Sequence, residues 1–184
     1  MPSDAITMPE LMQALPHIRS APVTDAPISS LCFRPGYGQR QFPDRLRLTV
    51  AQGVPGERWM TAAWLRQPDG RPDPRIQVSI LPTRVMELVW RDRLAQPHPG
   101  DTIVADLETS EANLPAGTLL QAGSAILRVS DVFNDGCVKW KVRYGSDAKD
   151  WITAPGHPTL RLRGILCEIV TDGDVTLSDR IVKL

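Results

Sequence analysis

The stretch LLQAGSAILRV, residues 119–129, carries the clearest structural signal in this chain. Leu119–Ala122 and Ala125–Val129 are short apolar segments, and Gln121–Ser124 joins them through a glycine. Two such segments with a tight glycine-containing turn are typical of a β-hairpin. We therefore expect antiparallel sheet around residue 120.

Further short strands are expected on both sides of this hairpin. Residues 45–50 alternate between polar and apolar side chains, the period of a half-buried strand. The other expected strands are Ile28–Arg34, Ile76–Leu81, Thr102–Leu107, Val138–Tyr144, Leu160–Val170 and Val175–Val182. Many short strands with few helices predict a mainly β (α+β) fold, a β-barrel with a few short helices.

Three helical segments complete the pattern. Thr7 and Glu10 have the spacing of a capping box, so a helix should begin at this point. Pro82 opens an amphipathic segment, and Ser146–Ile152 can form one or two helical turns. We expect an N-terminal helix and linker over residues 1–27 and a barrel domain over residues 28–184.

Composition excludes several classes of protein. The 184 residues carry 21 Lys and Arg against 21 Asp and Glu, so the formal net charge is zero. Duplex nucleic-acid binders usually carry a basic excess, and no run approaches the ~18 apolar residues of a membrane span. No signal peptide is visible at the N-terminus. We expect a cytoplasmic protein with no nucleic-acid or membrane partner.

The three cysteines are far apart in the sequence and form neither a disulfide framework nor a zinc knuckle. Cys167 shares its strand parity with Ile165 and Ile169, so it should be buried. Cys32 lies in an apolar segment and should be buried as well. Cys137 remains as the candidate for chemistry.

Cys137 lies in the segment NDGCVKWKVRY, residues 134–144, which we expect to be a strand. One face of that strand would be core, formed by Val138, Trp140, Val142 and Tyr144. The other face would carry Cys137, Lys139, Lys141 and Arg143. Nearby cations lower the pKa of a thiol and favour the thiolate, and they could also hold a phosphate. The alternative is a solvated basic face with an incidental thiol.

A second candidate is the loop GVPGERW, residues 53–59. Gly56 would let the backbone turn closely around an anion, and Arg58 could bind a phosphate or carboxylate in bidentate fashion. The alternative is an ordinary turn followed by a salt-bridged arginine. The loop lacks the GK[ST] ending of the common phosphate-binding loop.

Several segments together carry a family resemblance. They are GVPGERW (53–59), RIQVSIL (75–81), DLETSEANLPAGTLLQAGSAILRVSDVFNDGCVKW (106–140), RYGSDAKDWI (143–152) and LRLRGI (160–165). In this order they resemble the MOSC domain, the family named after the C-terminal domain of molybdenum cofactor sulfurases. The resemblance spans roughly residues 28–184, and the long middle segment is its most specific part.

The resemblance implies a β-barrel with a pocket for molybdopterin or a related anion. Cys137 matches a cysteine that handles sulfur or ligates molybdenum in characterised members. Arg58 and Lys139 are then candidates for the cofactor phosphate, and Asn113 matches an asparagine near the family's pocket. Asn113 could equally be a turn residue before a proline. The remaining candidates for cofactor binding are Gly56, Asn134, Lys141 and Arg143.

The chain also departs from the family. It has no counterpart of the sulfurase's pyridoxal-phosphate desulfurase domain, so pyridoxal phosphate binding applies only to the family as a whole. It also lacks the additional N-terminal β domain of the mitochondrial amidoxime-reducing relatives. Glu57-Arg58-Trp59 stands where many bacterial relatives have Asp-Arg-His, so no role of that histidine transfers.

Three functions remain open from the sequence. The first is a stand-alone molybdenum-cofactor enzyme or sulfur-transfer protein, in which Cys137 is the molybdenum ligand or the persulfide carrier. Its partner would be a sulfur-donating desulfurase or an electron-donor protein. The second is a non-catalytic module that binds the cofactor or an anion. The third is a barrel that has lost its ligand.

Overall fold

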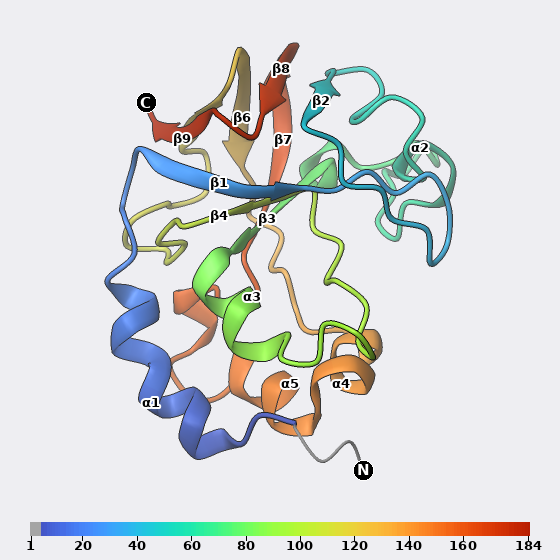
Figure 1. Cartoon of the computed structure of the whole chain (residues 1–184). Helices are drawn as coiled ribbons and strands as arrows, with labels where there is room; N and C mark the ends of the chain where they lie inside the picture. The colour runs from blue at the N-terminus through green and yellow to red at the C-terminus, as the bar shows by residue number, and fades with distance from the viewer. Residues whose placement is uncertain (1–4) are drawn as a thin grey trace.

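The computed structural model describes residues 5–184, and over this range the chain forms nine β-strands and five short α-helices (Figure 1). The strands are β1 (Ala26–Leu31), β2 (Arg45–Leu48), β3 (Val78–Pro82), β4 (Ile103–Ala105), β5 (Leu119–Ala122), β6 (Ala125–Val129), β7 (Ile165–Thr171), β8 (Gly173–Thr176) and β9 (Arg180–Lys183). The helices are α1 (Met8–Arg19), α2 (Trp59–Ala62), α3 (Thr83–Val89), α4 (Val138–Tyr144) and α5 (Ser146–Ile152). Single 3-10 turns occur at Pro74–Ile76 and Pro158–Leu160.

Seven of these strands form a closed barrel in the order β1-β4-β3-β7-β6-β5-β9, and β9 pairs with β1 to close it. The pairing of β3 with β4 is parallel, and all other neighbours in the barrel are antiparallel. Strands β2 and β8 form a separate two-stranded sheet. The predicted mainly β fold with a barrel and a few short helices is confirmed.

The hairpin predicted around residue 120 is the β5–β6 pair, with Ala122 opposite Ala125 across the turn. Gly123 has a φ of +60°, and a Cβ atom there would lie 2.2 Å from the backbone oxygen of Asp174. A side chain at this position would therefore meet the neighbouring β8 backbone, which moves only with the strand. The glycine is a steric requirement of the turn.

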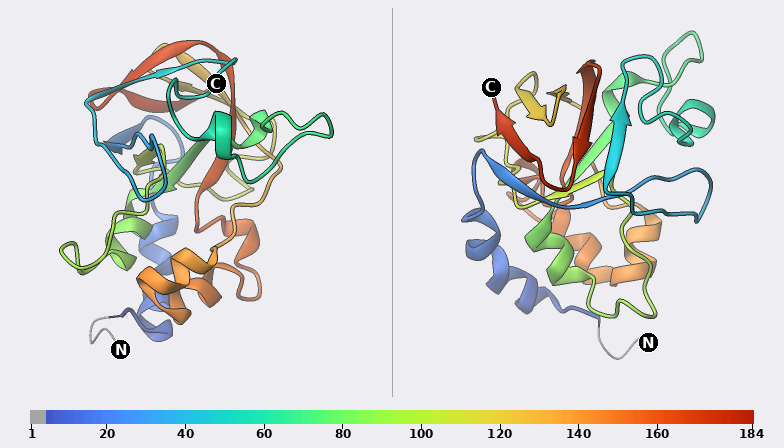
Figure 2. Two further views of the ribbon diagram at one scale, coloured as in Figure 1. Left: turned by 90° about the vertical axis from the view of Figure 1, so that its right-hand side faces the viewer. Right: turned by 45° about the horizontal axis from the view of Figure 1, so that its top comes forward.

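The buried residues form two main cores. One fills the barrel with alternate side chains from its strands, and Leu120, Leu127 and Ile169 are examples. The other lies beneath one end of the barrel, where α1, α3, α4 and α5 gather (Figures 1 and 2). Helix α1 begins as predicted: the Thr7 backbone N–H donates to the Glu10 carboxylate at 2.8 Å. Helix α1 packs on α3 and α5, which belong to the predicted barrel domain. The division of the chain into residues 1–27 and 28–184 stays a prediction.

The prediction of a strand over Val138–Tyr144 is wrong, because this segment is helix α4. Trp140 and Tyr144 are 3% and 1% exposed, whereas Val138 and Val142 are 73% and 76% exposed. Residues four apart share one face of a helix, so the two aromatic rings bury together at a centroid distance of 4.7 Å. The alternation of apolar and basic residues in this segment is compatible with a strand as well as with a helix. The structure is a helix, in which Trp140 and Tyr144 pack into the core between α1, α3, α4 and α5.

Apart from the β5–β6 hairpin, the other predicted strands differ in their bounds, and two of them include a turn. The segment Leu160–Val170 contains a turn at its start, and β7 begins only at Ile165. The segment Val175–Val182 is interrupted after Thr176, where its backbone N–H and hydroxyl both donate to the Asp179 carboxylate. This local turn separates β8, which pairs with β2, from β9, which closes the barrel.

Candidate functional site

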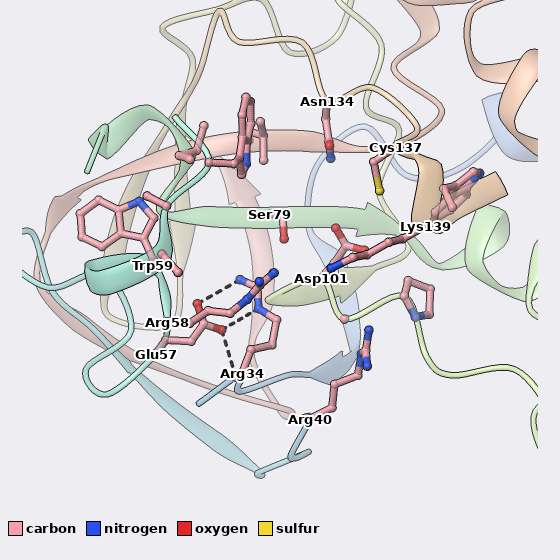
Figure 3. A pocket seen from close by; sticks show the side chains of 18 of the residues that line it. Arg34, Arg40, Glu57, Arg58, Trp59, Ser79, Asp101, Asn134, Cys137 and Lys139 are labelled. Atoms are coloured by element: carbon pink, nitrogen blue, oxygen red, sulfur yellow. Dashed lines mark hydrogen bonds and ion pairs between the residues drawn. The ribbon is translucent and has the colours of Figure 1, made fainter. Parts of the chain in front are cut away.

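A cavity of about 440 Å³ lies beside the barrel, between the loops that precede α2 and α4. We call it the cationic pocket because its lining holds six basic and three acidic side chains: Arg34, Arg40, Arg58, Lys139, Arg143 and Arg163 against Glu57, Asp101 and Asp135. Figure 3 shows Asn134, Cys137 and Lys139 on one side. Arg34 and Arg58 lie across from them, with Ser79 of β3 between the two groups.

Cys137 occupies the N-cap position of α4, in an extended backbone conformation immediately before the first helical residue. All three cysteines are free, and Cys137 is the exposed one. Burial raises the pKa of the Cys32 thiol to about 11 and that of Cys167 to about 12, so both stay protonated at neutral pH. Cys137 is therefore the thiol that solutes can reach.

Four basic side chains of the pocket form no salt bridge with any carboxylate in residues 5–184. They are Arg40, Arg58, Lys139 and Arg143. Burial, followed by the positive charge of Arg143, lowers the pKa of Arg40 below its ordinary value. Arg58 and Lys139 both approach the ring of Tyr37, at 5.0 and 5.1 Å from its centroid. Positive charges gathered in this way favour an anionic ligand.

The loop that presents Arg58 is held by a buried ion pair. The Glu57 side chain is fully buried and accepts from Arg34 Nε at 2.8 Å and from Arg34 Nη2 at 3.0 Å. Burial alone would lower the pKa of Arg34, but the hydrogen bonds and the charge of Glu57 hold it above its ordinary value. This bidentate pair joins the end of β1 to the loop before α2 and fixes the position of Arg58.

A second ion pair links the pocket to the helical core. Arg163 Nη1 donates to Asp101 Oδ1 at 2.8 Å, and its guanidinium carbon lies 4.5 Å from the Trp140 ring centroid. The other oxygen, Asp101 Oδ2, is buried and has no hydrogen-bond partner in the described part of the chain. Arg40 Nε is buried without a partner in the same way. The pocket thus contains one unsatisfied acceptor and one unsatisfied donor.

The structure brings together five of the residues chosen from the sequence. Cys137, Arg58, Asn134, Lys139 and Arg143 all line the cationic pocket. Their roles toward a ligand stay predictions.

The other three residues chosen from the sequence lie outside the pocket lining. Gly56 forms the turn before Glu57 with a φ of +83°. Lys141 is exposed on α4. Asn113 Nδ2 donates to the Glu108 and Val23 carbonyls, and its Oδ1 accepts from Lys183. These hydrogen bonds tie the segment around Asn113 to Val23 and to Lys183 of β9.

Several residues that line the pocket were not predicted from the sequence. Arg34, Arg40, Asp101 and Arg163 come from loops far apart in the chain, and the closed barrel brings them together. One feature of the sequence could have pointed to this pocket: Ser79, which lines it, is a polar residue within the otherwise apolar strand β3. Its hydroxyl accepts from the Thr102 backbone N–H at 3.1 Å.

Two features are absent among residues 5–184. No cluster of three or more His, Cys, Asp or Glu side chains is placed to hold a metal ion. Within this range, moreover, every helix is too short or too polar to cross a membrane.

Comparison with known proteins finds likeness in structure but not in sequence. No protein-family model matches the chain, and no curated protein matches it either. Among solved structures, the YuaD protein from Bacillus subtilis matches with a TM-score of 0.60 and 20% identity, over 85% of this chain and 93% of that one. YiiM from Escherichia coli matches with a TM-score of 0.56 and 16% identity, over 85% of this chain and 69% of that one. A structure described as a hypothetical protein matches with a TM-score of 0.58 and 18% identity, over 86% of this chain but only 65% of that one.

These likenesses establish a shared fold. The closed seven-stranded barrel is the kind of fold that the sequence resemblance implies.

Proposed function

We propose that this chain is a MOSC-type domain that binds molybdopterin, or a closely related anion, in the cationic pocket. In this proposal Cys137 is the molybdenum ligand or carries a persulfide sulfur. The observation that carries the proposal is the meeting of the one exposed thiol with four basic side chains that lack a carboxylate partner in residues 5–184.

The chemistry of the lining fits such a cofactor. Molybdenum favours soft sulfur ligands, and Cys137 offers one at the pocket wall. Arg58 and Lys139 offer positive charge to a phosphate. The unsatisfied Asp101 Oδ2 requires a donor, and the N–H edge of a pterin ring supplies one.

Cys137 can act in either of two ways. As a thiolate ligand it would hold molybdenum, whose bound centre would supply the two-electron redox chemistry. As a carrier, its thiolate would attack the terminal sulfur of a persulfidic cysteine on a donor protein. A new S–S bond then forms at Cys137 and the donor's S–S bond breaks, so the donor leaves as a thiolate. Both roles need an exposed, reduced thiol.

We propose that the partner is a persulfide-bearing desulfurase or an electron-donor protein, and that the domain works in the cytoplasm, where thiols stay reduced. Reduction of an N-hydroxylated base by the loaded protein with an electron donor would identify an enzyme. Cofactor retained without turnover would identify a non-catalytic module.

The test compares two lysines of α4. Lys139 lines the pocket, whereas Lys141 is exposed outside it. Protein is expressed in a host that makes molybdopterin, and the pterin released per chain is measured by fluorescence after oxidation. We expect Lys139→Gln to lower the pterin content several-fold relative to wild type, while Lys141→Gln leaves it unchanged. Equal pterin contents in both variants, or no pterin in the wild type, would refute the proposed site.

A further inference from the structure

A second cavity, of about 340 Å³, is lined by residues of β1, of α3 and of the segment that follows α3. It shares no lining residue with the cationic pocket. The two cavities meet at one segment of the chain, since His98 lines the second cavity and Pro99 and Gly100 line the first. The second cavity is therefore a separate candidate site.

His98 supplies an unsatisfied donor at this cavity. The Gly100 backbone N–H donates to His98 Nδ1 at 3.0 Å, so the ring proton of neutral His98 resides on Nε2. Burial lowers the pKa of His98 to about 4, which keeps the ring neutral at pH 7. The residue is only 7% exposed, and Nε2 has no hydrogen-bond partner in the described part of the chain.

Ser30 supplies a second unsatisfied group. Its Oγ is buried and also lacks a partner among the described residues, and Ser30 lines the same cavity as His98. An unsatisfied buried donor or acceptor destabilises the folded state, and such groups are rare in folded proteins. Two such groups on residues that line one cavity make it a candidate site for a polar ligand.

The walls of this cavity are apolar and largely aromatic. Phe42 and Trp90 pack edge-on against the His98 ring, with centroid distances of 4.8 and 4.9 Å. Leu31 and Met86 extend the apolar wall. Edge-to-face packing of this kind also accommodates an aromatic ring from a ligand.

A cation lies at the same cavity. Arg93 contributes to the lining, and its guanidinium carbon lies 5.0 Å from the centroid of the Trp90 ring. Within residues 5–184 the cavity lining includes no acidic side chain to balance this charge. The polar contribution of the cavity is therefore two neutral hydrogen-bonding groups and one positive charge.

We infer that this second cavity binds a small aromatic carboxylate. The aromatic ring would pack among Phe42, Trp90 and Met86. The carboxylate would accept from His98 Nε2–H and the Ser30 hydroxyl and face the positive charge of Arg93. This inference does not depend on the function proposed for the cationic pocket.

The probe is phenylacetate, and its binding to the full chain is measured by titration calorimetry. Phenylacetamide is the neutral comparison, because it has the same ring and nearly the same shape but no charge. We expect phenylacetate to bind with a defined stoichiometry of one, and phenylacetamide to bind at least about tenfold more weakly. Absence of phenylacetate binding, or equal binding of the two compounds, would overturn the inference.

Variants locate the binding. His98→Phe keeps an aromatic ring between Phe42 and Trp90 but removes the Nε2 donor, together with the acceptor of the Gly100 N–H. Ser30→Ala removes a single hydroxyl that has no partner in the described part of the chain. Each should weaken phenylacetate binding about fivefold or more. Arg58→Ala, in the cationic pocket, should leave it unchanged. If Ser30→Ala binds like wild type, or if Arg58→Ala abolishes binding, the carboxylate does not occupy this cavity.

Discussion

Replacing Trp140 with alanine tests how α4 is anchored under the pocket. The Trp140 ring is buried, packs edge-to-face on Tyr144, and donates from Nε1 to the Ala148 carbonyl at 3.2 Å. The guanidinium carbon of Arg163 lies 4.5 Å from the centroid of the same ring. Removing a buried tryptophan costs about 3–5 kcal/mol through lost packing and the cavity left behind. At about 2–4 °C per kcal/mol for a chain of this size, we expect the melting temperature to fall by roughly 10 °C.

The control for this experiment is Val142→Ala on the same helix. Val142 is exposed, so its truncation should change the free energy of unfolding by less than about 0.5 kcal/mol. Both variants are melted under identical conditions and followed by circular dichroism. In a strand, Trp140 and Val142 would share the buried face. Comparable destabilisation by both substitutions would therefore refute the helical arrangement of residues 138–144.

Three further outcomes are expected. Glu57→Gln should lower the free energy of unfolding in urea by about 3–5 kcal/mol, because it leaves the Arg34 charge without its buried partner; a loss below 1 kcal/mol would show that the pair is not structural. Brief iodoacetamide treatment of the native protein should label Cys137 first by mass mapping, and preferential labelling of either buried thiol would contradict its position. Because the folded pKa of His98 is about 4 against an ordinary 6.5, the unfolded chain takes up the proton first. Stability present above pH 6.5 should therefore fall by up to about 3 kcal/mol toward pH 4. His98→Phe should flatten that loss in denaturation curves, and an unchanged slope would count against the buried neutral ring.

Much of the barrel was predictable because its signals are local. The hairpin at Gly123 depends on a turn that only glycine fits, and its two strands are apolar on both sides of that turn. The first helix follows from the Thr7 and Glu10 pair, which are three residues apart. The burial of Cys167 followed from its parity with the apolar residues of β7. Each prediction needed only a few consecutive residues.

The helix at residues 138–144 was not predictable in this way, since its sequence alternates as a strand does. Trp140 and Tyr144 select the helix only because α5 and the loop at Pro97 offer them a core and hydrogen-bond acceptors. These contacts depend on the tertiary structure, and no short sequence window contains them.

The same distinction between local and tertiary signals applies to the residues of the cationic pocket. Residues of one continuous stretch, from Asn134 to Arg143, were found together because they are near in sequence. Arg34 follows β1 and Asp101 precedes β4, and the antiparallel pairing of β1 with β4 makes them neighbours. Asn113 was chosen through a family resemblance, but it lies outside the pocket lining, and its amide group bonds to Glu108, Val23 and Lys183.

The role of Cys137 is tested by the molybdenum content of wild type and Cys137→Ser after expression in a host that makes the cofactor. The substitution is nearly isosteric at an exposed N-cap, so both proteins should melt at nearly the same temperature. A serine hydroxyl is a hard donor that neither ligates molybdenum as a thiolate does nor carries a persulfide. The account predicts metal, or a persulfide mass increment at residue 137, in the wild type alone. Equal molybdenum in both proteins with no persulfide on Cys137, or a much lower melting temperature for Cys137→Ser with normal cofactor loading, would contradict it.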